Sequence, residues 1–188
     1  MTGDIVGAVK SFFDFLKIAL SKRKNPSDAI IDRINIRLIG RDLVKSRHAV
    51  DCFFLVMVHN GGGKLRPDNF IYWSIIDGWY NEDLMQGFDH EKYLLVYTES
   101  EFLILARRIY ENKGVGVVVD QMEKSKLKTS FQYERLKYIR FFFIKQDKRA
   151  QWFLMVGTTA PNETLDSIDA EAEIFSSVNS VKNIIKDY

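Results

Sequence analysis

The most informative stretch of this chain is an apolar run that ends in a polar, glycine-rich corner: Val50-Asp51-Cys52-Phe53-Phe54-Leu55-Val56-Met57-Val58-His59-Asn60-Gly61-Gly62-Gly63-Lys64. The run predicts a buried β-strand that stops at His59 and Asn60, where the chain turns. Glycines reach positive φ and carry no Cβ, so the N–H groups of Gly61, Gly62 and Gly63 can approach a ligand or a neighbouring strand closely. The corner is therefore the best candidate site in the sequence.

Phosphate binding is one hypothesis for this corner, because backbone donors and the Lys64 ammonium can cradle an anion. The corner does not match a Walker A loop. Val58 stands where that motif needs its first glycine, and Leu65 replaces the Ser or Thr that would hold magnesium. Tyr72, in the following strand, is a further predicted ligand-binding residue, because its ring can stack on a ligand.

His59 allows three interpretations. The first two are a general base and a metal ligand. In the third, His59 and Asn60 both form hydrogen bonds to the local backbone and so hold the turn. The other two histidines, His48 and His90, stand at no metal-ligand spacing from it. The sequence contains no catalytic motif, so we predict a protein that is not an enzyme, with the corner either structural or ligand-binding and the ligand unknown.

Composition narrows the class of protein. With 188 residues, 46% of them hydrophobic, the chain can bury one substantial core. A formal charge of +2, from 27 basic and 25 acidic side chains, is too balanced to predict a nucleic-acid partner. The single cysteine, Cys52, excludes a disulfide framework and fits a cytoplasmic protein in which it serves as a small buried hydrophobe.

Residues 1–25 form a predicted amphipathic extension to a domain over residues 26–188. Lys10, Asp14 and Lys17 interrupt the apolar stretch, which is too short and too charged to span a bilayer. Apolar residues recur at helical spacing: Ile5, Val9, Phe12, Leu16 and Leu20. This stripe has three alternative fates, which are packing on the domain, pairing with a second copy, and lying on a membrane with residues 22–24 at the headgroups.

A second helix is predicted over residues 28–47. Its apolar face is formed by Ile30, Ile31, Ile34 and Leu38, with Val44 as a further candidate. A basic stripe at four-residue spacing is expected to form a solvated face, with phosphate or lipid contact as the alternative: Arg33, Arg37, Arg41 and Lys45.

The remaining pattern alternates strands and helices. Residues 69–79 form a second strand that pairs with the first, and alternation places Tyr72 and Trp73 on opposite faces. Residues 81–90 read as a surface segment that folds over the corner, and residues 125–131 as a mobile polar segment. Further strands are predicted over residues 92–98, 115–119, 138–145 and 150–157, and helices over residues 99–113 and 165–186.

This order resembles the GAF domain, which is related in architecture to PAS. The His59–Gly63 sequence is similar to the His-Asn-Gly signature of small GAF-like proteins, many of them encoded by bacteriophages. The resemblance covers roughly residues 27–188. It implies an α+β fold with an antiparallel sheet, the first and last helices together on one face, and a ligand cleft on the other.

GAF domains commonly bind small molecules and dimerise through their terminal helices. The resemblance therefore implies a non-catalytic sensor or small-molecule-binding module that forms a homo-oligomer. An assembly or adaptor protein acting through the terminal helices, in peripheral contact with a membrane, is the alternative. A hydrolase or transferase using His59 is a third hypothesis.

Overall fold

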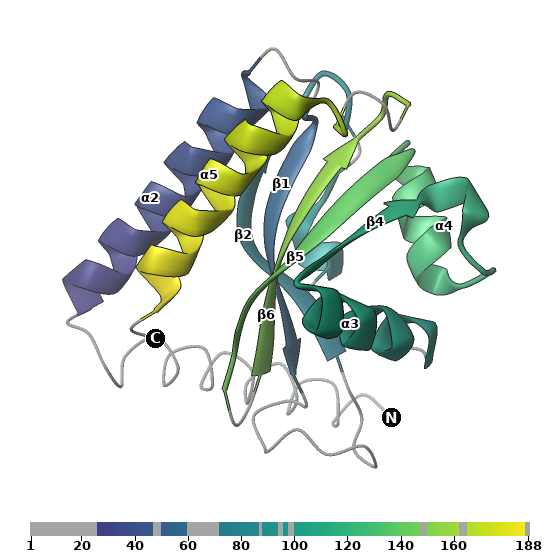
Figure 1. Cartoon of the computed structure of the whole chain (residues 1–188), viewed down its shortest axis with the longest axis horizontal. Helices are drawn as coiled ribbons and strands as arrows, with labels where there is room; N and C mark the ends of the chain where they lie inside the picture. The colour runs from purple at the N-terminus through teal and green to yellow at the C-terminus, as the bar shows by residue number, and fades with distance from the viewer. Residues whose placement is uncertain are drawn as a thin grey trace.

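The computed structural model describes residues 26–46, 50–59, 72–86, 88–93, 96–97, 100–147, 150–161 and 165–186. The predicted extension over residues 1–25 and most of the glycine corner, residues 60–64, lie outside this part of the chain. The described elements form a central sheet with helices on both faces, as Figure 1 shows. This arrangement confirms the predicted α+β class.

The sheet has six antiparallel strands in the order β3-β2-β1-β6-β5-β4. The strands are β1 (Cys52–His59), β2 (Tyr72–Tyr80), β3 (Val96–Tyr97), β4 (Gly114–Val118), β5 (Tyr138–Gln146) and β6 (Ala150–Thr158). The predicted hairpins β1–β2 and β5–β6 are both confirmed, and β1 and β6 pair with each other at the centre of the sheet.

Every residue of β1 is buried, because the sheet is covered on both faces. Alternate side chains enter two separate cores. We call these the helix-side core, which contains Phe53, Leu55 and Met57, and the far-side core, which contains Phe54, Val56 and Val58. Cys52 is fully buried in the far-side core, which confirms its prediction as a small hydrophobe.

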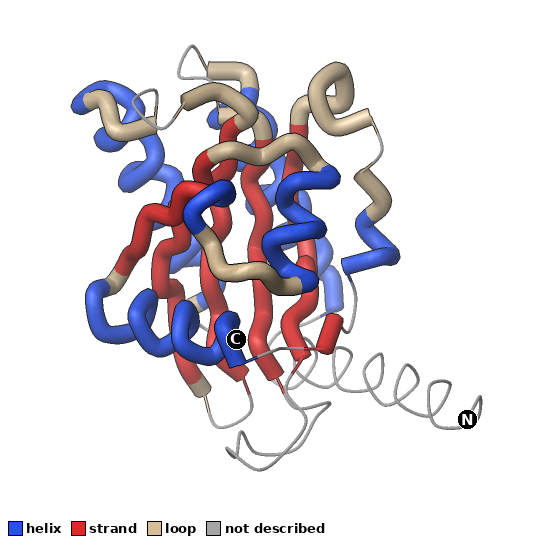
Figure 2. The backbone as a smooth tube through the Cα atoms, turned by 90° about the vertical axis from the view of Figure 1, so that its right-hand side faces the viewer, coloured by secondary structure: helices blue, strands red, loops and turns tan. Residues whose placement is uncertain are grey.

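Helices α2 (Pro26–Val44) and α5 (Ile168–Ile185) lie side by side over the helix-side core (Figure 1). This pairing confirms that the first helix of the domain and its last helix share one face. The opposite face carries α3 (Ser100–Asn112), α4 (Lys126–Tyr133) and the short 3-10 helices η1 (His90–Tyr93) and η2 (Val119–Gln121). Figure 2 shows helices and loops in front of the sheet on that side.

Two predictions about local structure were wrong. Residues 125–131 are not a mobile polar segment, because they belong to α4, which begins with Ser125 accepting a hydrogen bond from the Lys128 amide. Leu127 and Phe131 of this helix are buried in the far-side core. Residues 92–98 are not one strand, since the 3-10 helix η1 extends to Tyr93; among the described residues of this range, Val96–Tyr97 pair with β2.

The apolar face predicted for α2 points outward. Its members Ile30, Ile31, Ile34 and Leu38 are between 39% and 61% exposed, whereas Ile36 and Leu43 are buried against the sheet. Gly40 lies on the buried side, where a Cβ would stand 2.7 Å from the Phe53 ring. The helix carries apolar side chains on both sides, and periodicity alone does not tell which side meets the core.

The predicted basic stripe of α2 is only partly a solvated face. Arg33 and Arg37 each bind the buried carboxylate of Asp77 on β2, with Nε–O distances of 2.8 and 2.6 Å. A β-bulge makes this contact geometrically possible, because Leu55 pairs with Asp77 while Val56 pairs with Ile75. The extra residue turns Asp77 to the helix side, where strict alternation would have sent it to the far side.

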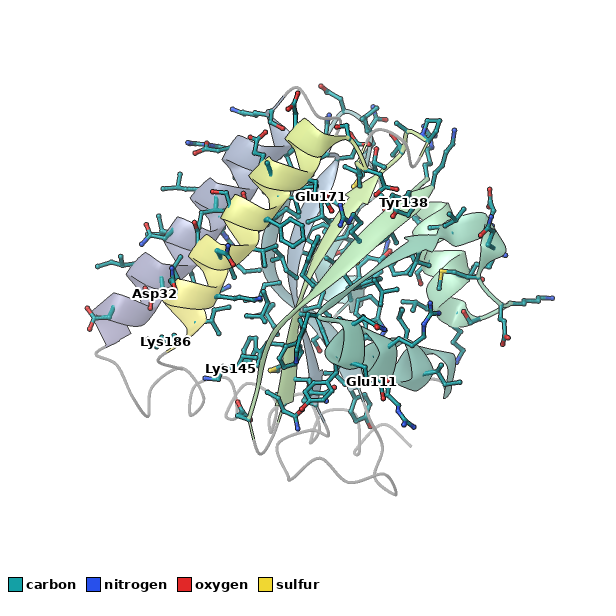
Figure 3. The ribbon with its side chains drawn as sticks, viewed as in Figure 1. Asp32, Glu111, Tyr138, Lys145, Glu171 and Lys186 are labelled. Carbon is teal, nitrogen blue, oxygen red and sulfur yellow. The ribbon has the colours of Figure 1, made fainter. Side chains whose placement is uncertain are left out.

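Side-chain hydrogen bonds connect β5 to the start of helix α5. Arg140 donates to the Glu171 carboxylate at 2.9 Å, and the Tyr138 hydroxyl donates to Asp166 at 3.1 Å. Figure 3 shows Tyr138 and Glu171 at the same end of the sheet. These contacts fix the start of α5, whose N-cap is Ser167. Within the part of the chain that the structure describes, no helix has the length and hydrophobicity needed to cross a bilayer.

Candidate functional site

The structure buries His59, the last residue of β1. Its Nε2 atom lies 3.1 Å from the Ser74 hydroxyl, and its ring lies 6.0 Å from the ring of Tyr72. Burial lowers the pKa of His59 to about 4, because the charged imidazolium loses its hydration. The imidazole is therefore neutral at physiological pH.

His59 and Tyr72 lie at one end of the sheet. By alternation with Met57, His59 belongs to the helix side, the same side as Ser74. Trp73 enters the far-side core, so the prediction that Tyr72 and Trp73 take opposite faces is confirmed. The other predicted ligand-binding residues, Asn60, Gly61, Gly62, Gly63 and Lys64, lie outside the described residues, and the role of this corner stays a prediction.

Asn81 begins the segment that was expected to fold over the corner. It follows Tyr80, which pairs with Cys52 at the opposite end of β2 from Tyr72. The chain then returns across the far side of the sheet, where the rings of Tyr93 and Trp73 lie 5.8 Å apart. This return forms an aromatic layer on the far side of the sheet. The glycine corner lies outside the described residues, so a cover over it stays a prediction.

The aromatic layer consists of five rings in contact. Phe88 is its centre, stacked between Phe54 at 4.8 Å and Tyr93 at 5.2 Å, with Tyr80 tilted against it at 4.7 Å. Trp73 completes the layer through Tyr93. These rings cover β1 and β2 on the face of the sheet where the GAF resemblance implied a ligand cleft.

A buried hydrogen bond marks the edge of the layer. The Tyr93 hydroxyl donates to the Glu134 carboxylate at 2.8 Å, and Glu134 is only 5% exposed. Burial raises the pKa of Glu134, because a carboxylate is poorly solvated there, while Tyr93 and Lys92 act against this rise. The pKa of the Tyr93 phenol is raised for the same reason.

The end of α4 orients this carboxylate. Leu136 N–H donates to the Phe131 carbonyl and Arg135 N–H to the Gln132 carbonyl, the pattern of a Schellman C-cap. Arg135 adopts a φ of 59°, a left-handed conformation that glycine usually provides. Glu134 sits immediately before this residue, so the turn that ends α4 also aims its side chain at Tyr93.

Glu134 lies between two hollows in the surface. The larger has a volume of about 760 Å³, and the smaller, of about 240 Å³, shares Tyr133 and Glu134 with it. We call the larger one the α4 cavity. It is lined by Lys92, Tyr93, Lys124, Ser125, Lys126, Thr129, Ser130, Tyr133 and Glu134.

The α4 cavity combines opposite charges. Its lining includes the Glu134 carboxyl group, which accepts a hydrogen bond, and three lysines. Tyr133 is 67% exposed and offers a flat ring at the side. Among the described residues, no group of three His, Cys, Asp or Glu side chains is placed to hold a metal ion.

Sequence reasoning did not find this cavity. Glu134 stands in a polar stretch with no motif, and its partner Tyr93 is 41 residues away along the chain. One local signal existed, the N-cap Ser125 followed by apolar Leu127 and Phe131 at helical spacing. That signal would have predicted α4 but not the burial of Glu134.

Comparison with solved structures supports the GAF resemblance of the fold. The chain superposes on the GAF domain region of a protein from Geobacter sulfurreducens PCA with a TM-score of 0.54 and 13% identity, covering 85% of this chain and 96% of that one. For a phycoerythrobilin-bound GAF domain from a cyanobacterial phytochrome the TM-score is 0.53 at 11% identity, with 96% and 94% covered.

The blue-light absorbing form of the PixJ GAF domain of Thermosynechococcus elongatus is similar with a TM-score of 0.51 and 8% identity, covering 85% of this chain and 90% of that one. At these identities the likeness shows the fold alone. No protein-family model and no curated protein matches this sequence. The chain therefore has a GAF-like fold, and its function has to be argued from its own residues.

Proposed function

We propose that this chain is a non-catalytic sensor or small-molecule-binding module whose ligand occupies the α4 cavity. The observation that carries the proposal is the Tyr93–Glu134 pair in the wall of that cavity. A volume of about 760 Å³ suits a small molecule, since ligand pockets range over roughly 300–1,000 Å³. Burying a carboxyl group costs stability, and a buried carboxyl beside a cavity is a usual mark of a binding site.

The lining suggests what the ligand carries. Glu134 accepts hydrogen bonds, so the part of the ligand that meets it bears N–H or O–H donors. Lys92, Lys124 and Lys126 line the same cavity and favour a negative group on the ligand. The exposed ring of Tyr133 adds a surface on which a planar group can stack. A planar ligand with donors on one edge and an anionic substituent satisfies all three features.

The non-catalytic part of the proposal draws on the placement of the reactive side chains. Cys52 is fully buried, and burial raises the pKa of its thiol, which disfavours the thiolate that nucleophilic attack requires. His59 lies on the helix side of the sheet, and the α4 cavity lies on the far side. Neither residue lines the cavity that holds Glu134.

The experiment is native mass spectrometry of protein purified gently from its own host. We expect a bound mass that is lost in Glu134→Gln and kept in Glu111→Gln, a matched change at an exposed glutamate of α3 that Figure 3 labels. A mass that survives Glu134→Gln but disappears in the double variant His59→Ala, Asn60→Ala would move the site to the glycine corner. If no mass and no thermal shift with metabolite pools is seen, the binding proposal fails.

Assembly through the terminal helices, with or without contact with a membrane, is the alternative proposal. It predicts a dimer in size-exclusion chromatography with light scattering, or co-sedimentation with anionic vesicles. Origin from a bacteriophage, suggested by the His59–Gly63 sequence, is a further part of the proposal. The genes that surround this one test that origin.

A further inference from the structure

Helix α2 presents apolar side chains on two opposite sides. Ile36 and Leu43 point into the helix-side core, while Ile30, Ile31, Ile34 and Leu38 point away from it and are 61%, 53%, 51% and 39% exposed. We call these four residues the outer stripe. Three of them follow one another at four-residue spacing, so they form a continuous line along the helix.

A continuous apolar line on a surface needs a cover, whereas scattered apolar residues do not. The outer stripe holds four of the nine large hydrophobic residues that are exposed in the described part of the chain. The neighbouring side chains of Arg33 and Arg37 extend toward Asp77 and bind its carboxylate, so they extend away from the outer stripe. The stripe is therefore suited to bind an apolar helix.

We infer that residues 4–24 of the same chain dock on the outer stripe as a helix antiparallel to α2. This segment has its own predicted apolar stripe and ends directly before Pro26, the first residue of α2. Two antiparallel helices joined by a short turn form a common hairpin. Because the connection is short, the effective concentration of the segment at α2 is far above that of a second copy.

The lengths agree. At 1.5 Å per residue, the 19 residues of α2 extend about 28 Å, and residues 4–24 extend about 30 Å as a helix. A turn at about residue 25 then sets opposite one another the following pairs: Leu20 and Ile31, Leu16 and Ile34, Phe12 and Leu38. The apolar stripe of the segment therefore faces the outer stripe along most of its length.

The charges agree with the antiparallel direction. The basic residues 22–24 come next to the first half of α2, which carries Asp28 and Asp32. Figure 3 places Asp32 on α2 near its lower end. At the other end Asp4 approaches Lys45, an exposed residue just beyond α2. Opposite charges at both ends favour this direction over the parallel one.

The test uses engineered cysteines in the full chain. The natural Cys52 is fully buried and its thiol pKa is raised, so it contributes little background reaction. We expect Leu16→Cys with Ile34→Cys to form a disulfide within one chain under mild oxidation. The matched control is Leu16→Cys with Asn35→Cys, because Asn35 is exposed one position further around the same helix. It should remain reduced.

Whether the disulfide forms within one chain or between two chains shows whether residues 4–24 or a second copy covers the outer stripe. A disulfide between two chains, together with a dimer in light scattering, would overturn the inference in favour of a second copy. No disulfide in either variant, together with equal maleimide labelling of Ile34→Cys and Asn35→Cys, would also overturn it. The ligand proposal for the α4 cavity is unaffected by these results, since it concerns the other face of the sheet.

A labelling experiment covers the case in which the cysteine pair distorts the segment. In the full chain, Ile34→Cys should react with a maleimide roughly tenfold more slowly than Asn35→Cys, which corresponds to about 1.4 kcal/mol of protection. Adding Leu16→Asp should remove the protection. Equal rates for the two single variants would contradict the docking of residues 4–24.

Discussion

The pH dependence of stability offers a direct test of the burial of His59. Its side chain is fully buried, and burial lowers its pKa from 6.5 to about 4. In the unfolded chain the imidazole takes up a proton as the pH falls below 6.5, whereas in the folded protein it resists until about pH 4. The unfolded state therefore binds more protons in this window, and the free energy of unfolding falls as the pH is lowered.

The size of the effect follows from the shift. A difference of about 2.5 units at about 1.36 kcal/mol each gives a loss of about 3 kcal/mol between pH 7 and pH 4. About 2 kcal/mol of this is lost already at pH 5. Glu134 acts in the opposite direction, because burial raises the pKa of its carboxyl group. Since a domain is stable by only about 5–15 kcal/mol, the His59 effect is large enough to measure.

The assay is urea unfolding of the full chain at half-unit steps from pH 7.5 to pH 4, compared with His59→Gln. The variant keeps His48, His90 and Glu134, so subtracting the two curves leaves the contribution of His59 alone. The wild-type free energy should fall by about 3 kcal/mol relative to the variant. Parallel curves, within about 0.5 kcal/mol, would show that His59 is solvated in the folded protein and would refute its burial.

Other substitutions test the remaining contacts, each by urea unfolding at pH 7. Tyr93→Phe removes the donor to buried Glu134 and should cost about 1–2 kcal/mol; no loss would show that water replaces the hydroxyl. Asp77→Asn weakens both ion pairs to α2 and should cost about 1–2 kcal/mol, limited by the half-exposed arginines. Arg135→Gly relieves a left-handed residue and should add about 0.5–1 kcal/mol, whereas a loss would assign the arginine a contact of its own. Gly78→Ala places a Cβ against the Phe53 carbonyl oxygen and should cost about 2 kcal/mol, and a neutral result would contradict that close approach.

Much of the sheet could be predicted because its long strands are apolar runs bounded by polar turn residues. The β5–β6 hairpin has two long apolar runs around a short polar connection, residues 147–149, and the structure confirms the hairpin. The burial of Cys52 follows in the same way, since it stands within the apolar run of β1. This hairpin and the burial of Cys52 therefore needed only short-range patterns.

The α4 cavity could not be predicted, because it depends on contacts between distant segments. Glu134 has its buried hydrogen-bond donor because the return from β2 brings Tyr93 to it. The orientation of α2 was equally hidden, since both of its sides are apolar and only packing on Phe53 selects Ile36, Gly40 and Leu43 as the inner one. The position of Asp77 depends on a bulge that the alternation of β2 does not reveal.

That bulge has a consequence for changes in chain length. Loss of Ile76, the residue it adds to β2, would leave the remaining residues of the strand on their present faces, because regular pairing would simply resume. Deletion of Ser74 would instead move the side chains on one side of the deletion to the opposite face of the sheet. We expect natural relatives that are one residue shorter in this strand to carry their deletion at Ile76.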